Sequence, residues 1–69
     1  MKVLLNGEPR ALPDSAVLGD AVAASGAEPQ GRGVAVAVDG EVVPRGEWAT
    51  TEVRDGQELE VLRAVQGGA

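Results

Sequence analysis

The sequence contains no cysteine and no histidine, and its only aromatic residue is Trp48. Without thiols or imidazoles, the chain has no thiolate nucleophile, no disulfide, no histidine base and none of the usual zinc ligands. Catalysis by side chains would have to rely on Asp, Glu, Lys or Ser. A short chain also leaves little room for a deep pocket, because a domain of about 60 residues buries only about 60% of its unfolded surface. An enzyme in its own right is therefore the least favoured class.

Positive charge is also scarce: six Lys and Arg stand against eleven Asp and Glu, a formal net charge of −5. A negative chain repels the phosphates of nucleic acids and anionic lipids. We therefore expect no nucleic acid and no membrane as partners, and favour a basic protein surface. No apolar run approaches the roughly 20 residues of a membrane span, and the apolar start stops at Asn6, too short for a signal peptide. We expect a cytoplasmic protein with no bound metal or cofactor.

The first residues predict a β-hairpin. An apolar segment at 3–5 is followed by Asn6-Gly7, a type I′ turn signal, and by a second strand candidate at 8–12. Pro9 indicates that this second strand lies at a sheet edge, because proline cannot donate a ladder hydrogen bond.

One short amphipathic helix is expected next. Asp14 or Ser15 could cap its start, and Gly26 stands where a helix ends in a left-handed residue. Its apolar residues at one-face spacing are Val17, Leu18, Ala21 and Val22. Residues 27–33, rich in Gly and Pro, predict a loop.

The second half is rich in strand patterns. Strands are predicted at 34–38, 41–43, 51–53 and 57–65, with a tight Asp39-Gly40 turn and one helical turn at 47–50. The resulting order ββαββ predicts an α+β domain at 1–65, a mixed sheet of four to five strands with one helix on one face. A right-handed crossover would place the first and last strands side by side.

A flexible arm, residues 66–69, is expected after the last strand. Gly67 and Gly68 carry no side chains, so the arm is thin enough to enter a narrow active site of another protein. If the chain takes part in chemistry, this arm is where it happens.

Alternation along the strands predicts an apolar patch beside the arm. If the valines of 34–38 face the helix, then Ala35, Ala37 and Leu62 face the open side of the sheet. Ordinary apolar surface and a docking patch are both open interpretations. The predicted partner-binding residues are Ala35, Ala37, Leu62, Val65 and Gln66.

Other conspicuous residues have simpler interpretations. We expect Trp48 to fill or cover the edge of a small core. The carboxylates of Asp55, Glu58 and Glu60 are expected on a solvated strand face and not in an acid–base site, because no pocket is indicated that would perturb them.

Several segments together resemble the ThiS family, the sulfur carriers of thiamine biosynthesis. The matching segments, in order, are Asn6-Gly7-Glu8, Ser25-Gly26, the block 34–45, Glu47-Trp48, Asp55-Gly56 and Gly67-Gly68. Each turn alone is common, but their order and spacing over nearly the whole chain are specific. The ubiquitin-like β-grasp fold of this family agrees with the element order.

The resemblance implies a mechanism without catalytic side chains. An E1-like (ThiF-like) adenylyltransferase would use ATP to activate the carboxylate of Gly68. Sulfur would then replace AMP, and the glycyl thiocarboxylate would deliver sulfur to a thiazole synthase (ThiG-like). Gly67 would keep the arm slim in the partner's channel.

The sequence departs from the family pattern at its end. The reactive glycine of the family is the last residue, whereas here Ala69 follows Gly68. Three explanations are open: a C-terminal peptidase removes Ala69, the residue is an artificial addition, or the partner accepts alanine. We favour the first two, because a methyl group at the reacting residue would be felt in a channel built for glycine. Gln57, where the family often has an acidic residue, is a smaller departure.

Three alternative functions remain. A carrier for molybdopterin or cysteine synthesis would share the fold and tail, although Asn6-Gly7-Glu8 and the segment 43–48 favour thiamine. A ubiquitin-like modifier would be conjugated to lysines through Gly68. A non-catalytic β-grasp binding module would keep its activity after loss of residues 67–69.

Overall fold

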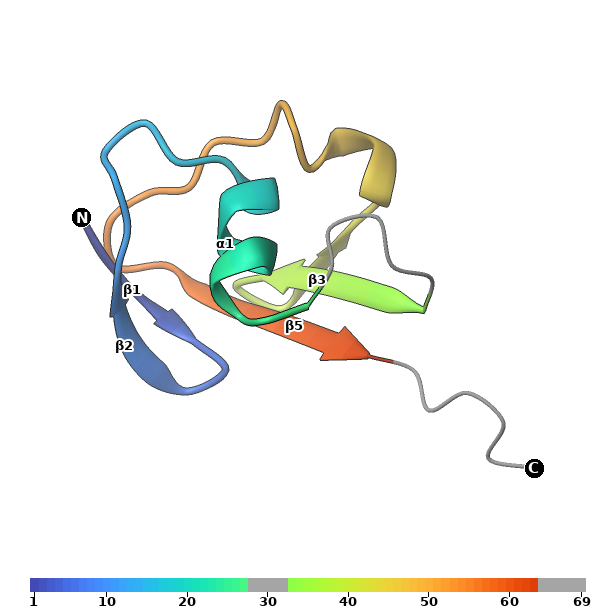
Figure 1. Cartoon of the computed structure of the whole chain (residues 1–69), viewed down its shortest axis with the longest axis horizontal. Coiled ribbons are helices and arrows are strands. Elements are labelled where there is room, and N and C mark those ends of the chain that lie inside the picture. Colours follow the sequence, from blue (N-terminus) through green and yellow to red (C-terminus); the bar gives the residue numbers. More distant parts are fainter. Residues whose placement is uncertain (28–32, 64–69) are drawn as a thin grey trace.

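A computed structural model describes residues 1–27 and 33–63. Its five strands form one mixed sheet with a single α-helix packed on it, an α+β arrangement (Figure 1). The elements in chain order are β1 (Lys2–Leu5), β2 (Glu8–Ala11), α1 (Leu18–Ala24), β3 (Val34–Val38), β4 (Glu41–Val43), the 3₁₀ turn η1 (Arg45–Glu47) and β5 (Glu58–Arg63). The predicted fold class is confirmed. The boundary predicted between a domain at 1–65 and an arm at 66–69 lies outside the described residues.

The last strand lies in the middle of the sheet. The strand order is β2-β1-β5-β3-β4. β1 and β5 run parallel, whereas the other neighbouring pairs are antiparallel. This confirms that the first and last strands are side by side. It also confirms that Pro9 belongs to an edge strand, β2.

Two turns set the register of the two hairpins. Asn6 and Gly7 have φ values of 52° and 83°, and Asp39 and Gly40 have 49° and 90°. Two successive positive φ values are the geometry of a type I′ turn, whose twist matches that of the flanking strands. Both turn predictions are therefore confirmed.

The helix begins later than the capping signal predicts. Val17 is the extended N-cap residue, and its N–H donates to the Asp20 carboxylate at 2.9 Å. The prediction of Asp14 or Ser15 as the cap is wrong, because both lie in the turn closed by the Ala16 N–H and the Pro13 carbonyl. The predicted end is confirmed, since Gly26 has φ 90°.

The segment 51–53 does not form a strand of the sheet. It makes one isolated antiparallel bridge, between Val17 and Glu52. The Val53 N–H donates to the Ala16 carbonyl at 3.0 Å, so its backbone is satisfied by the chain that leads into α1. The prediction of a short strand here is wrong because these hydrogen bonds go to the helix approach and not to the sheet.

A single helical turn follows β4, slightly earlier than the predicted 47–50. Pro44, with φ −60°, precedes η1, and Trp48 closes it. The Trp48 side chain is buried, and its indole N–H donates to the Val43 carbonyl at 2.9 Å. This confirms that Trp48 belongs to the core and shows how its one polar group is satisfied.

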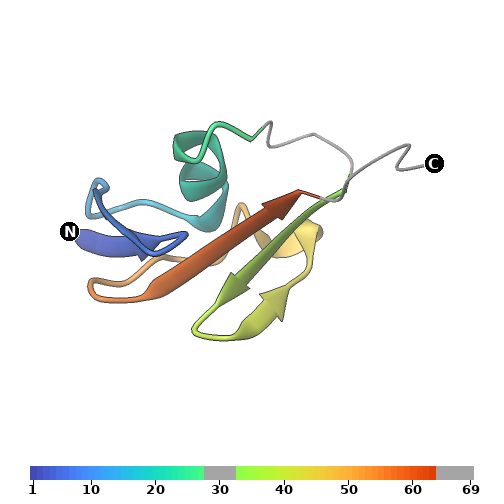
Figure 2. The same ribbon diagram turned by 90° about the horizontal axis from the view of Figure 1, so that it is seen from below.

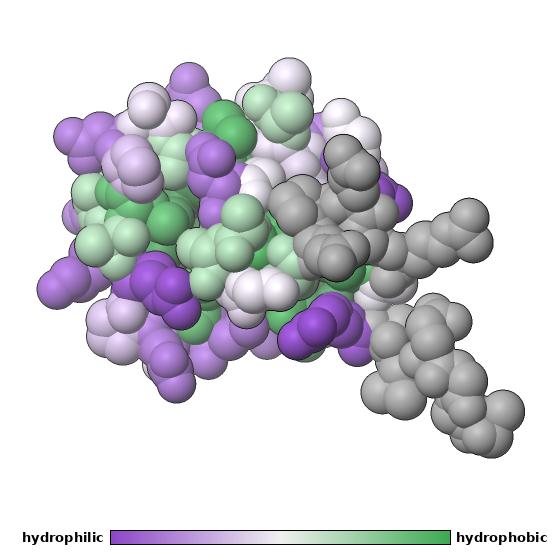
Figure 3. Space-filling model, viewed as in Figure 1, coloured by the Kyte–Doolittle hydropathy of each residue, from purple (hydrophilic) through white to green (hydrophobic). Residues whose placement is uncertain are grey.

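The core lies between α1 and the facing side of the sheet. Leu18, Ala21 and Val22 of the helix are fully buried against Val36 of β3 and Leu59 of β5. Burial of one such aliphatic side chain contributes about 1.5–3 kcal/mol. Figure 3 shows apolar residues in a band across the middle of the molecule, with hydrophilic residues around it.

Candidate functional site

The sheet carries α1 on one side only, and Figure 2 shows the helix lying on that side. Directly paired residues on neighbouring strands share a face, and alternate residues of a strand face opposite ways. The register therefore defines the face turned away from α1, which we call the uncovered face. Its residues on the four adjoining strands are Lys2, Leu4, Glu58, Glu60, Leu62, Ala35, Ala37 and Val42.

One end of the uncovered face is apolar. Ala35 lies directly opposite Leu62, and Ala37 lies opposite Val42. Leu62 is 58% exposed and Val42 is 72% exposed, and they are the large exposed hydrophobic side chains among residues 1–27 and 33–63. Three of these residues lie where alternation predicts them. Their role in binding a partner stays a prediction.

Val42 is the residue of this apolar patch that sequence reasoning missed. The signal was present, since a two-residue turn at Asp39-Gly40 fixes the pairing of Ala37 with Val42. Counting back from the turn on both strands would have placed Val42 on the same face as Ala37. We call Ala35, Ala37, Val42 and Leu62 the apolar patch.

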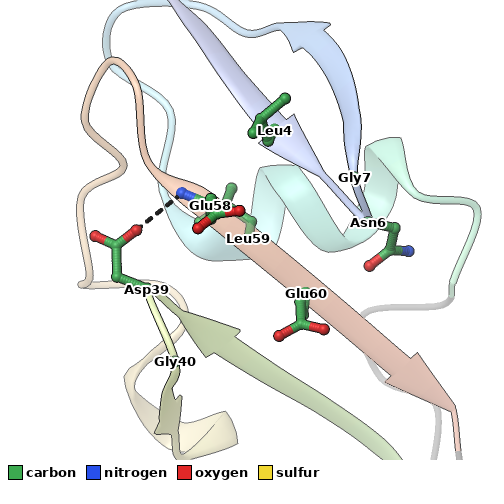
Figure 4. A pocket seen from close by; sticks show the side chains of 8 residues that line it. All are labelled: Leu4, Asn6, Gly7, Asp39, Gly40, Glu58, Leu59 and Glu60. Carbon is green, nitrogen blue, oxygen red and sulfur yellow. Dashed lines mark hydrogen bonds between the residues drawn. The ribbon is translucent and has the colours of Figure 1, made fainter.

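The other end of the uncovered face is acidic and hollowed. A depression of about 540 Å³ lies between the two hairpin turns, across the start of β5 (Figure 4). Its lining residues are Leu4, Asn6, Gly7, Asp39, Gly40, Glu58, Leu59 and Glu60. Within the described parts of the chain, no three acidic side chains are grouped so as to hold a metal ion.

The carboxylates near this depression differ in their contacts. Asp39 accepts a hydrogen bond from the Glu58 N–H at 2.9 Å, whereas the side chains of Glu58 and Glu60 are exposed. Asp55, at the turn before β5, accepts from the Lys2 N–H at 2.7 Å. Negative charge therefore borders the apolar patch along β5.

Two turn residues accept hydrogen bonds from the backbone of β5, one on each flank of the strand. The Asn6 Oδ1 atom accepts from the Val61 N–H at 2.8 Å, and Asp39 accepts from the Glu58 N–H. In a continued parallel ladder, the acceptor for Val61 would be the backbone carbonyl of residue 6. The side-chain carbonyl of Asn6 takes that place where the backbone turns at positive φ. The sequence identified Asn6 and Asp39 only as turn residues.

Four of the predicted site residues cannot be placed. Val65, Gln66, Gly67 and Gly68 lie outside the described residues. The structure therefore locates the apolar patch and the strand that precedes the predicted arm. The reacting end of the site stays a prediction.

The strand order, the two hairpins and the single helix across one face define a ubiquitin-like β-grasp protein. The family model of ThiS matches residues 3–68, and the chain belongs to the ThiS family. This confirms the resemblance found in the sequence.

Two solved structures from Geobacter metallireducens are similar to this chain. The crystal structure of its thiamine biosynthesis protein ThiS is 30% identical with a TM-score of 0.78, and the match covers 99% of this chain and 100% of that one. An NMR solution structure of a thiamine biosynthesis protein from the same organism is 30% identical with a TM-score of 0.77, covering 100% of this chain and 90% of that one. A comparison with curated proteins gives no match. Among residues 1–27 and 33–63, no helix has the length and apolar character to cross a membrane.

Proposed function

We propose that this protein is a sulfur carrier that supplies sulfur for thiazole formation in thiamine biosynthesis, with Gly68 as its reactive residue. The observation that carries the proposal is the ThiS-family match, which extends through Gly67 and Gly68. Membership of the family supports the carrier role, and the chain needs no catalytic side chain for it.

The proposed chemistry takes place on the carboxylate of Gly68. One carboxylate oxygen attacks the α-phosphorus of ATP in the E1-like adenylyltransferase, pyrophosphate leaves, and an acyl adenylate forms. A sulfur nucleophile at the oxidation level of sulfide then attacks the acyl carbon. The bond to AMP breaks, AMP leaves with its electron pair, and one oxygen of the carboxylate has been replaced by sulfur. The partner's use of ATP favours a cytoplasmic location.

The uncovered face would orient the carrier on its partners. Ala35, Val42 and Leu62 offer an apolar centre, and Glu58 and Glu60 lie next to it. An interface with an apolar core and a charged rim fits a partner surface with an apolar centre and basic margin. We propose that the adenylyltransferase and the thiazole synthase both use this face, one after the other.

The proposed chemistry requires a free carboxylate on Gly68, which Ala69 occupies with its peptide bond in this sequence. We propose that a C-terminal peptidase exposes the Gly68 carboxylate wherever the native chain carries Ala69. The partner's channel then meets two residues without side chains at the reacting end.

The test uses two recombinant chains, one ending at Gly68 and one ending at Ala69. Each is incubated with the E1-like adenylyltransferase of the same organism, ATP and inorganic sulfide, and then weighed intact by mass spectrometry. We expect the chain ending at Gly68 to gain the mass difference between sulfur and oxygen, and the chain ending at Ala69 to stay unchanged.

Two other results would decide against the proposal. If ATP releases no pyrophosphate in the presence of the chain ending at Gly68 and that chain gains no mass, the carrier mechanism is wrong. If an isopeptide adduct to lysine forms instead, the chain is a ubiquitin-like modifier. A transfer assay with thiazole synthase, set beside one with molybdopterin synthase partners, separates the thiamine pathway from its nearest rival.

A further inference from the structure

One flank of β5 is paired along less of its length than the other. β3 pairs with β5 from Leu59 to Arg63. β1 pairs only with Glu58 and Leu59, because its chain leaves β5 at the Asn6-Gly7 turn. Figure 1 shows the β5 arrow continuing past the end of the β1–β2 hairpin.

The backbone groups on that shorter flank can be assigned. The N–H groups of Leu4 and Asn6 donate to the carbonyls of Gln57 and Leu59, at 3.0 and 2.9 Å. Because strand residues alternate in direction, every second residue of β5 after Leu59 also directs its N–H and carbonyl toward the β1 side. These residues are Val61 and Arg63.

One backbone group on this flank, the N–H of Val61, already has a hydrogen-bond partner. The Val61 N–H donates to the Asn6 side chain. Within residues 1–27 and 33–63, no hydrogen bond from the β1 side reaches the Val61 carbonyl or the Arg63 N–H. Arg63 also makes no ladder bond to β3, since it faces Val34 in a pair that is not hydrogen-bonded.

The Val61 carbonyl and the Arg63 N–H have the spacing of a parallel ladder. In such a ladder, one residue donates to the carbonyl before its opposite residue and accepts from the N–H after it. Leu4 has this place opposite Glu58. The Val61 carbonyl and the Arg63 N–H are related in the same way across Leu62, so they can take one residue of another extended chain.

We propose that the E1-like adenylyltransferase adds an extended segment to this flank of β5, paired with the Val61 carbonyl and the Arg63 N–H. This inference rests on the proposed function. Backbone groups enclosed in an interface need hydrogen-bond partners, and Leu62 places this flank at the border of the apolar patch. Strand addition satisfies those groups and sets the direction of the chain immediately before the predicted arm.

The occupant is specified by the neighbouring side chains. The partner residue opposite Leu62 would share its face, where Ala35 lies on the other side of β5. An apolar side chain in that place would extend the apolar patch by one strand. Exposed Glu60 favours a basic residue nearby in the partner.

The decisive variant is Arg63→Pro, compared with Arg63→Ala. Proline removes the Arg63 N–H, which points away from β3, so the β3 ladder keeps its bonds and only the flank on the β1 side changes. Alanine removes the same charged side chain but keeps the N–H. Binding to the purified adenylyltransferase is measured by calorimetry for chains ending at Gly68, and adenylation by pyrophosphate exchange.

We expect Arg63→Pro to bind about tenfold more weakly than Arg63→Ala or worse, as one unsatisfied interface hydrogen bond implies. Adenylation by subsaturating carrier should fall in proportion. If the proline variant unfolds, an amide-to-ester replacement of the same N–H in a semisynthetic chain gives the same comparison.

The two proposals fail in different ways. If the wild-type chain is adenylated and the two Arg63 variants bind equally, strand addition is wrong and the carrier function stands. If the wild-type chain is neither bound nor adenylated, the carrier function falls and strand addition to this enzyme falls with it.

Discussion

The two faces of the sheet use the same strands for different purposes. On β5, Leu59 faces the helix and is 1% exposed, whereas Leu62 faces away and is 58% exposed. On β3 and β4, Val36 is fully buried and Val42 is 72% exposed. All four side chains are aliphatic, so hydrophobicity alone does not tell core from surface. Register does, because a strand turns successive side chains to opposite faces.

This difference separates stability from recognition. The face that packs on α1 forms the hydrophobic core and stabilises the domain. The uncovered face has apolar side chains that are exposed in the isolated chain. Contiguous exposed apolar groups beside charged ones are typical of surfaces that bind other proteins. The difference between the two faces can be tested by pairs of substitutions that make the same chemical change on opposite faces of the sheet.

The largest effect is expected for Leu59→Ala compared with Leu62→Ala. Leu59→Ala leaves a cavity between helix and sheet, and should lower the free energy of unfolding by about 2–5 kcal/mol. Leu62→Ala removes the same atoms from an exposed position and should change it by less than about 0.5 kcal/mol. Urea denaturation monitored by Trp48 fluorescence measures both. Equal losses would show that the uncovered face also contributes to the core.

The next effect concerns binding and uses two exposed alanines. Ala35→Asp introduces a charge into the apolar patch, whereas Ala23→Asp introduces the same charge on α1. We expect Ala35→Asp to weaken binding to the adenylyltransferase by about 1–2 kcal/mol, because the charge would be desolvated in the interface.

The control variant, Ala23→Asp, is expected to bind the adenylyltransferase with the affinity of the wild type. Calorimetric titration of both variants, each checked for an unchanged unfolding midpoint, gives the comparison. A loss of affinity that is equal for Ala23→Asp and Ala35→Asp would argue for a general effect of net charge and against docking through the uncovered face.

Much of the fold could be predicted because local signals fix register. Asn6-Gly7 and Asp39-Gly40 each specify a two-residue hairpin turn, and from there alternation assigns faces. The same rules placed Ala35 on the uncovered face. The prediction of the helix cap was wrong because the capping residues belong to a turn that precedes the helix. The prediction of a strand at 51–53 was wrong because the hydrogen-bond partners of this segment lie in a distant part of the chain.

The candidate site divides in the same way. The residues on strands could be located from periodicity, whereas the bond from Val61 to Asn6 joins residues 55 positions apart and depends on the parallel pairing of β1 and β5. No local pattern contains that information. The predicted role of Gly67 and Gly68 rests on the family resemblance, and both residues lie outside the described part of the chain.

The smallest effect is expected for the hydrogen bond between the Val61 N–H and the Asn6 side chain, which lies in the plane of the sheet and belongs to neither face. Asn6→Gly keeps positive φ available but removes the acceptor for the half-buried Val61 N–H. We expect a loss of about 0.5–1.5 kcal/mol in the free energy of unfolding. Asp39→Gly removes the corresponding acceptor for the Glu58 N–H, which is exposed and can turn to water, so its loss should be smaller.

The matched control for the first substitution is Asn6→Asp, which keeps a side-chain oxygen and tolerates left-handed backbone. It should recover most of the lost stability, and hydrogen exchange should show protection of the Val61 amide reduced in Asn6→Gly and retained in Asn6→Asp. If the Val61 amide is equally protected in Asn6→Gly and Asn6→Asp, the Asn6 side chain does not replace the ladder acceptor, and the protection of this amide needs another explanation. If protection falls only with Asn6→Gly, the strand before the predicted arm is fixed by a residue of the first hairpin.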